Sequence, residues 1–246
     1  MSIPQSPLAS NSPARSLLIG SGFVLAYATM LMVGDLFYFE PENITIHWPA
    51  SGLLVAGLLI SQYRIWPVLL VLSLILHVVV DVSLHEDPFE LVLYNGTTNV
   101  LEALFGAWLV RRYSSDRVDM GNLRNVLALI ILAGLVSTAL GSFSGAAIAV
   151  QFGASSYWVA WYQWWFSHAL GVLVIAPSIL ACRSSTRSQL GSHGRFPMGE
   201  LSALFVVLVA IAQLVFGSSL LPGFLLIEFP YLVFPPMIWA ASVSYT

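Results

Sequence analysis

Charge and cysteine are scarce in this sequence, and lysine is missing altogether. Only 9% of its 246 residues are charged, against about 25% in soluble domains. The single cysteine, Cys182, excludes an internal disulfide and a thiolate metal site. Without a run of basic residues, the chain has no surface suited to nucleic acid. Because 58% of the residues are hydrophobic and the mean hydropathy is +0.84, the composition indicates a polytopic membrane protein.

The hydrophobic runs predict an all-α fold, a polytopic membrane helix bundle of about eight transmembrane helices. The predicted helices cover residues 16–33, 49–61, 66–82, 94–112, 123–150, a stretch that begins at Tyr157, 201–221 and 224–241. The second is short, as a re-entrant or tilted segment would be. We expect a disordered cytoplasmic tail over residues 1–15 and an integral-membrane domain over residues 16–246.

The arginines predict the orientation of the bundle. They are Arg15, Arg64, Arg111, Arg112, Arg117, Arg124, Arg183, Arg187 and Arg195. With eight spans, all of them fall on one side of the membrane, in the tail or after the second, fourth and sixth helices. The positive-inside rule makes that side cytoplasmic. Both termini are then cytoplasmic, and we expect a multi-pass protein of the bacterial inner membrane.

The predicted helix over residues 94–112 carries an unusual polar face. Asn95, Asn99 and Glu102 are spaced i, i+4 and i+7, so they share one side of a helix. A charged carboxyl facing lipid near the middle of a span costs on the order of 2.5 kcal/mol or more. This face should therefore point into the protein. Glu102 is then either a ligand-site residue or a neutral acid that serves packing.

Further polar candidates lie in neighbouring helices. His77 and Asp81 are spaced i, i+4 in the third helix, and Gln213 lies in the outer half of the seventh. His168 lies near the middle of the sixth helix, after an aromatic cluster that includes Trp164 and suits a membrane interface. Few polar residues lie in the inner half, so the pattern predicts a ligand pocket open to the outside.

Several interpretations of the histidines stay open. His168 is a candidate proton sensor, partner of Glu102, metal ligand or hydrogen-bonded bundle residue. His77 and Asp81 form an orienting pair, a metal half-site or a plain interface pair. Haem held by His77 and His168 is conceivable, but nothing in their spacing requires it, so we expect neither a cofactor nor a metal. Gly141 and Gly145 form a GxxxG pattern, interpreted as close helix packing.

Four motifs occur in order along the chain: WPASG at 48–52, NGTTNVLEALFGAWLVRR at 95–112, WWFSHALGVLVIAPSIL at 164–180 and FPYLVFPPMIWAA at 229–241. Together they resemble the first of the membrane-associated sensor (MASE) families, the integral-membrane input modules of bacterial signalling proteins. The motif residues carried over by this resemblance are Trp48, Pro49, Gly52, Asn99, Glu102, Gly171 and Pro177. At the position of His168 the family often has Asp.

The resemblance implies a sensory module that is not catalytic itself. It implies a C-terminal cytoplasmic output domain, a histidine kinase of a two-component system or a GGDEF diguanylate cyclase, which this chain lacks. We expect lipids, the fused output domain, a second copy in a homodimer and a possible partner membrane protein as its contacts. The alternative is a small-solute transporter or its substrate-binding subunit. An intramembrane enzyme is disfavoured, because the sequence lacks a recognisable nucleophile–base or metal-binding set.

Overall fold

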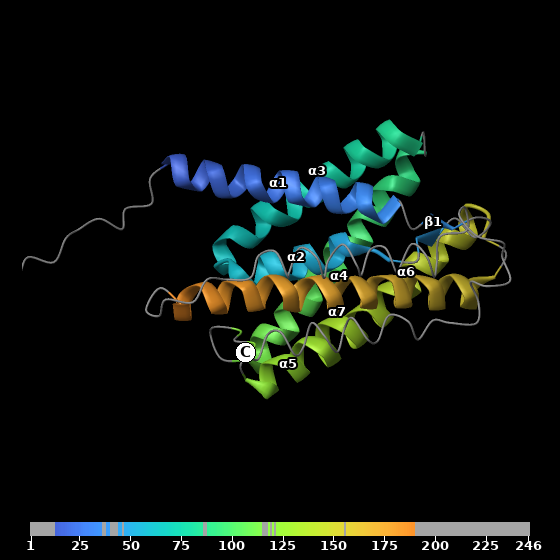
Figure 1. The fold of residues 1–246 in the computed structure, drawn as a ribbon. Helices are drawn as coiled ribbons and strands as arrows, with labels where there is room; N and C mark the ends of the chain where they lie inside the picture. The colour runs from blue at the N-terminus through green and yellow to red at the C-terminus, as the bar shows by residue number, and fades with distance from the viewer. Residues whose placement is uncertain are drawn as a thin grey trace, which may run out of the picture.

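The computed structural model describes residues 13–35, 38–39, 44–45, 47–85, 88–114, 118, 120, 122–154 and 156–189, and helices dominate them (Figure 1). The elements are α1 (Pro13–Asp35), β1 (Tyr38–Phe39), β2 (Ile44–Thr45), α2 (Pro49–Ile60), η1 (Tyr63–Ile65), α3 (Trp66–His85), α4 (Phe89–Tyr113), α5 (Leu123–Ala128), η2 (Leu129–Ser137), α6 (Thr138–Gln151) and α7 (Tyr157–Gln189). The two short strands pair antiparallel. The predicted helices over 201–221 and 224–241, and Gln213 with them, lie outside the described residues.

Helix boundaries differ from the predicted ones mainly at amino ends. Helix α1 begins at Pro13, so the last residues of the expected tail are already helical. Helix α4 begins at Phe89 rather than Tyr94, because Pro88 precedes it in an extended conformation and its carbonyl accepts the Val92 N–H at 3.2 Å. Glu90 in the first turn suits the positive end of the helix dipole.

Three described helices are long and apolar enough to cross a membrane: Tyr63–Leu84, Leu123–Gln151 and Tyr157–Arg183. Helix α4 is long enough but carries Asn95, Asn99 and Glu102, which lower its hydropathy. Helix α2 has 12 residues, so it is about 18 Å long and too short for a hydrocarbon core of about 30 Å. These helices support a membrane protein, while the count of eight spans and the cytoplasmic termini stay predictions.

Helix α2 occupies the centre of the described bundle. It lies between α1 and α7, with α4 crossing behind it (Figure 1). Ala50, Leu54, Val55 and Ala56 are almost completely buried although they point in different directions around the helix. A helix that is apolar all round belongs in the interior of a bundle. Its surroundings therefore decide what its few polar atoms contact.

Helices α2 and α7 touch backbone to backbone. A Cβ added to Gly52 would collide with the carbonyl oxygen of Gly171, and one added to Gly171 would collide with the carbonyl oxygen of Trp48. The N–H of Trp48 donates to the carbonyl of Ser167 at 3.2 Å. Small residues at such a crossing allow the close approach on which helix packing in membranes depends. The motif residues Trp48, Gly52 and Gly171 therefore fix α2 against α7.

Two arginines hold the carboxyl end of α2. Arg111 of α4 donates to the carbonyls of Leu59 at 2.9 Å and Ser61 at 2.6 Å. Arg183 of α7 donates to the carbonyl of Ile60 at 3.0 Å. Because the last carbonyls of a helix have no partner within the helix, cations are stabilised there. Arg111 and Arg183, two of the nine arginines that the sequence assigns to one side, thus meet at this end of α2.

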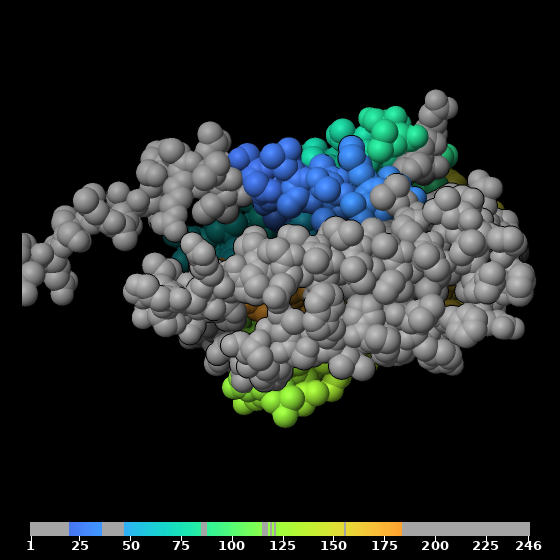
Figure 2. All heavy atoms as spheres, in the orientation of Figure 1, coloured from blue at the N-terminus to red at the C-terminus, as the bar shows by residue number. Residues whose placement is uncertain are grey.

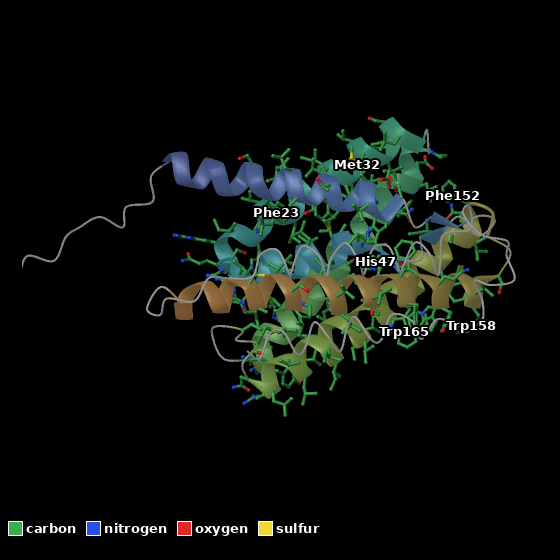
Figure 3. The ribbon with its side chains drawn as sticks, viewed as in Figure 1. Phe23, Met32, His47, Phe152, Trp158 and Trp165 are labelled. Carbon is green, nitrogen blue, oxygen red and sulfur yellow. The ribbon has the colours of Figure 1, made fainter. Side chains whose placement is uncertain are left out.

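The outer faces of the bundle are apolar. Leu25 of α1 is 69% exposed, and Val71 and Ile75 of α3 are more than half exposed. Helix α1 and part of α3 form the upper edge of the face seen in Figure 2. Aromatic Phe152 and Trp158 lie at the same end of the molecule (Figure 3), which is typical of a membrane-interface belt. This surface suits hydrocarbon rather than water.

Candidate functional site

Glu102 of α4 and His168 of α7 meet inside the bundle. Nδ1 of His168 lies 2.9 Å from Oε1 of Glu102. Both residues are buried, with 5% and 4% of their surfaces exposed. The polar face predicted for α4 therefore does point into the protein, and Glu102 has a histidine partner there. Of the interpretations left open for His168, the structure shows the pair with Glu102.

The imidazole of His168 is held between two indole rings. Trp164, one turn earlier on α7, lies with its ring centre 4.8 Å from that of His168, and the two planes are 30° apart. Trp48, which precedes α2, also stacks on His168. Their ring centres are 6.2 Å apart and the two planes differ by 9°. Ser51 of α2 places Oγ 3.3 Å from Nδ1 of the same ring. These contacts fix the ring plane, so Nδ1 is aimed at the carboxyl group.

The contact between the two side chains is a hydrogen bond whose donor depends on where the proton sits. A carboxylate only accepts hydrogen bonds, so Nδ1 of His168 donates when Glu102 is ionised. When Glu102 is protonated, its O–H donates to Nδ1 and the imidazole proton sits on Nε2. The 2.9 Å separation suits both arrangements. The pair can therefore exist as an ion pair or as a neutral hydrogen bond, and a shift of the proton changes the charge of both groups.

The predicted GxxxG pattern makes room for this site. A Cβ added to Gly141 of α6 would collide with Oε2 of Glu102, and one added to Gly145 would collide with the indole of Trp164. The sequence predicts close helix packing at these glycines, and α4 and α7 do approach α6 there. What the glycines admit are two side chains of the site. Ser137, at the end of the π-helical segment η2, donates to the backbone carbonyl of Glu102 at 2.6 Å and holds the same turn of α4.

A second imidazole lies on the far side of Trp48. His77 of α3 places Nε2 3.2 Å from Oδ2 of Asp81, one turn later. Its ring meets that of Trp48 edge-on, with centres 5.8 Å apart, and packs against Gly96 of α4. The indole of Trp48 thus contacts both His77 and His168.

The family assignment rests on nearly the whole chain. A model of the MASE1 family matches residues 18–242. The chain belongs to the MASE1 family. No curated protein matches it, and no solved structure does. The MASE1 domain is a membrane sensory domain, so the buried pair and its surroundings belong to a sensor.

The other site residues predicted for the MASE1 domain include Asn95 and Asn99 of α4 and Pro177 of α7. Asn99 is buried one turn before Glu102, whereas Asn95 is only partly buried. The side-chain oxygens of both asparagines are enclosed and accept no hydrogen bond from the described part of the chain. Pro177 lies inside α7, which continues through it. Within the described ranges, no group of three or more His, Cys, Asp or Glu side chains is placed to hold a metal ion.

Ser51 is one of the site residues that the sequence did not reveal. It lies in the WPASG motif that carried the resemblance, but a serine in the first turn of a helix gives no signal of its own. Only the close contact of α2 with α7 brings its hydroxyl to His168. Thr98 and Ser144 were also missed, and their hydroxyls meet at 3.2 Å between α4 and α6.

A pocket of about 220 Å³ lies beside the pair, between α4 and the continuous helix formed by η2 and α6. It is lined by Thr98, Leu101, Glu102, Phe105, Ser137, Leu140, Gly141 and Ser144. Of the candidate residues predicted from the sequence, Glu102 lines it. The pocket is open on one side, between apolar side chains that are themselves partly exposed.

Proposed function

We propose that this MASE1 domain is the transmembrane input module of a bacterial signalling protein, and that the signal acts on the Glu102–His168 pair. In this proposal the module is a homodimer in the bacterial inner membrane with both termini cytoplasmic. It biases a C-terminal output, a histidine kinase or a diguanylate cyclase. The observation that carries the proposal is the buried contact between Glu102 of α4 and His168 of α7.

The pair is suited to switching because it joins two helices in a place where water is excluded. Removing one partner of a buried ion pair costs about 3–5 kcal/mol, since the other charge is left uncompensated. A signal that takes the place of His168, or that changes where the proton sits, therefore changes the preferred packing of α4 against α7. A ligand shifts such an equilibrium only by its difference in affinity for the two arrangements.

The same two helices extend from the site to the arginine end of the bundle. Arg111 lies about 14 Å further along α4 than Glu102, at about 1.5 Å per residue. Arg183 lies about 22 Å beyond His168 on α7 by the same measure. Both arginines donate hydrogen bonds to backbone carbonyls at the carboxyl end of α2. A displacement of α4 relative to α7 at the site would therefore also move these two arginines. They lie at the end of the bundle that is proposed to face the output domain.

The alternative function is transport of a small solute, either alone or as a substrate-binding subunit. It is favoured by the short central helix α2 and by polar side chains in the middle of the bundle, both of which occur in transporters. Uptake of a solute by proteoliposomes that contain this chain alone would favour transport over sensing. Failure of uptake together with a signal-dependent output would favour the sensor.

The test uses the full protein with its output domain in its native membrane. Glu102→Gln keeps the shape of the side chain but removes its charge, and His168→Ala removes the imidazole. Both variants should change the output activity, measured as autophosphorylation or cyclic dinucleotide synthesis, while membrane insertion stays normal. Glu90→Gln is the matched control, because Glu90 lies exposed at the start of the same helix. Wild-type signalling from both site variants would refute the proposal.

A further inference from the structure

The pocket beside Glu102 opens towards the apolar surface of the bundle. Leu101 is 57% exposed, Phe105 38% and Leu140 51%, and all three line the opening. Glu102 lies near the middle of α4, whose ends carry Glu90 and Arg111. In a bilayer those charged ends belong near the two interfaces. The mouth of the pocket therefore faces the hydrocarbon layer, and a molecule would enter it sideways from the membrane.

The inner end of the pocket presents an unused acceptor. Oε1 of Glu102 is taken by His168, whereas Oε2 is enclosed and no described side chain or backbone group donates to it. Oε2 is directed at Gly141, a residue that lines the pocket and has no side chain to shield it. An enclosed carboxyl oxygen without a donor is costly, and more so when the group is charged. An occupant that donates a hydrogen bond there would remove this cost.

The other polar groups of the pocket are already engaged with one another. Ser137 donates its hydroxyl hydrogen to the carbonyl of Glu102. Thr98 and Ser144 share a hydrogen bond at 3.2 Å, so one of the two hydroxyl hydrogens is used within that pair. The pocket therefore contains one unused acceptor, Oε2 of Glu102, among largely apolar side chains. That combination suits an amphiphile whose head donates hydrogen bonds, and it disfavours an anionic head.

The size of the pocket limits the occupant. Its volume of about 220 Å³ leaves room for a compact head group. Because the pocket is open on one side, part of an alkyl chain attached to that head would remain in the bilayer.

We propose that the groove between α4 and α6 binds a membrane-dissolved amphiphile with a compact, hydrogen-bond-donating head, an ammonium or a hydroxyl, on one alkyl chain. The head donates to Oε2 of Glu102, and the chain lies along Leu101, Phe105 and Leu140. This inference rests on the proposed function, because it names the chemical class of the signal that would reach the Glu102–His168 pair. It also implies that the signal arrives through the lipid and not from the aqueous phase.

The experiment uses the complete protein in phosphatidylcholine nanodiscs and a photoreactive alkyl amine of about eight carbons as the probe. Photolabels, located by mass spectrometry, should concentrate on α4 and α6 at the residues of the groove. Octylamine and octanol should compete with the probe, whereas octanoate should not. The relative strength of octylamine and octanol decides between an ammonium and a hydroxyl head.

Variants separate the groove from ordinary lipid contact. Leu140→Trp, or Leu101→Trp where the first folds poorly, fills the mouth and should lower the labelling at least tenfold. Val71→Trp on the exposed face of α3 is the matched control and should leave the labelling of the groove unchanged. Glu102→Gln should weaken competition by octylamine at least tenfold, because the charge that attracts the ammonium is gone.

Two results would overturn the inference. One is labelling of the exposed face of α3 to the same extent as the groove, and the other is competition by octanoate as strong as that by octylamine. The two proposals fail separately. If labelling of the groove fails while Glu102→Gln alters the output, the lateral site is wrong and the sensor stands. If labelling holds while both site variants signal normally, the proposed role of the Glu102–His168 pair is wrong and the binding site stands.

Discussion

The bond between Glu102 and His168 should be measurable as a coupling energy. In a double-mutant cycle, Glu102→Met removes both carboxyl oxygens, and with them the hydrogen bond, with little change in volume. His168→Phe removes Nδ1 but keeps an aromatic ring between Trp48 and Trp164. The double variant has neither group, so the difference between the sum of the single effects and the double effect isolates the pair.

The size of the coupling follows from the geometry. At 2.9 Å and an effective dielectric constant of about 20, two unit charges attract each other by about 6 kcal/mol. Desolvation of both groups offsets a large part of this attraction. A neutral hydrogen bond between membrane helices contributes about 0.6 kcal/mol on average and at most about 1.7 kcal/mol. We expect a coupling of about 2–4 kcal/mol, above the neutral range, because both side chains are buried and their atoms approach closely.

The assay is reversible unfolding of the purified chain in mixed micelles, with the unfolded fraction followed as the denaturing detergent is increased. The wild type, the two single variants and the double variant each give a free energy of unfolding. The coupling energy is calculated from these four values. A coupling of about 1 kcal/mol would show that the two groups share a neutral hydrogen bond. A coupling below about 0.3 kcal/mol would mean that they are neighbours without a bond, and the reasoning on the pair would be refuted.

Two further predictions concern the contacts of α2. Gly52→Ala should destabilise the chain by about 1–3 kcal/mol in the same assay, because the new Cβ collides with the carbonyl of Gly171; Gly22→Ala, which meets nothing within 4 Å, should be neutral or slightly stabilising. Equal effects of the two glycine variants would contradict the close crossing. Arg111→Lys should cost about 1–2 kcal/mol, since an ammonium cannot reproduce the spread of donors that meets the carbonyls of α2. Arg112→Lys, at an exposed position, should change the stability by less than about 0.5 kcal/mol.

The helices were predictable to the extent that apolar runs mark them. The segments over α2, α3 and the long helix from Leu123 to Gln151 agree closely with the predicted ranges. The start of α4 was predicted too late, because the residues after Pro88 include Glu90 and do not form an apolar run. The π-helical geometry of η2 carries no sequence signal, since its residues are ordinary apolar ones.

The candidate site was predictable on one helix at a time. The helical period placed Asn99 and Glu102 on one buried face, and both are buried. Which residue would face Glu102 was left open, because His168 is distant in sequence and only the packing of α4 on α7 brings it close. Trp48 and Ser51 contact His168 for the same reason. Gly141 and Gly145 illustrate the general limit: a small residue shows where something comes close, but not whether it is a backbone or a side chain.

The crossing of α2 and α7 restricts how this domain can move. At Gly52 and Gly171 there is no room for even a methyl group. The backbone hydrogen bond from Trp48 to Ser167 joins the same two segments nearby. Sliding one of these helices along the other would drive main-chain atoms into each other, so the two should shift together as a single unit. A movement of α4 must then take place against that unit. The carboxyl–imidazole bond spans this same boundary.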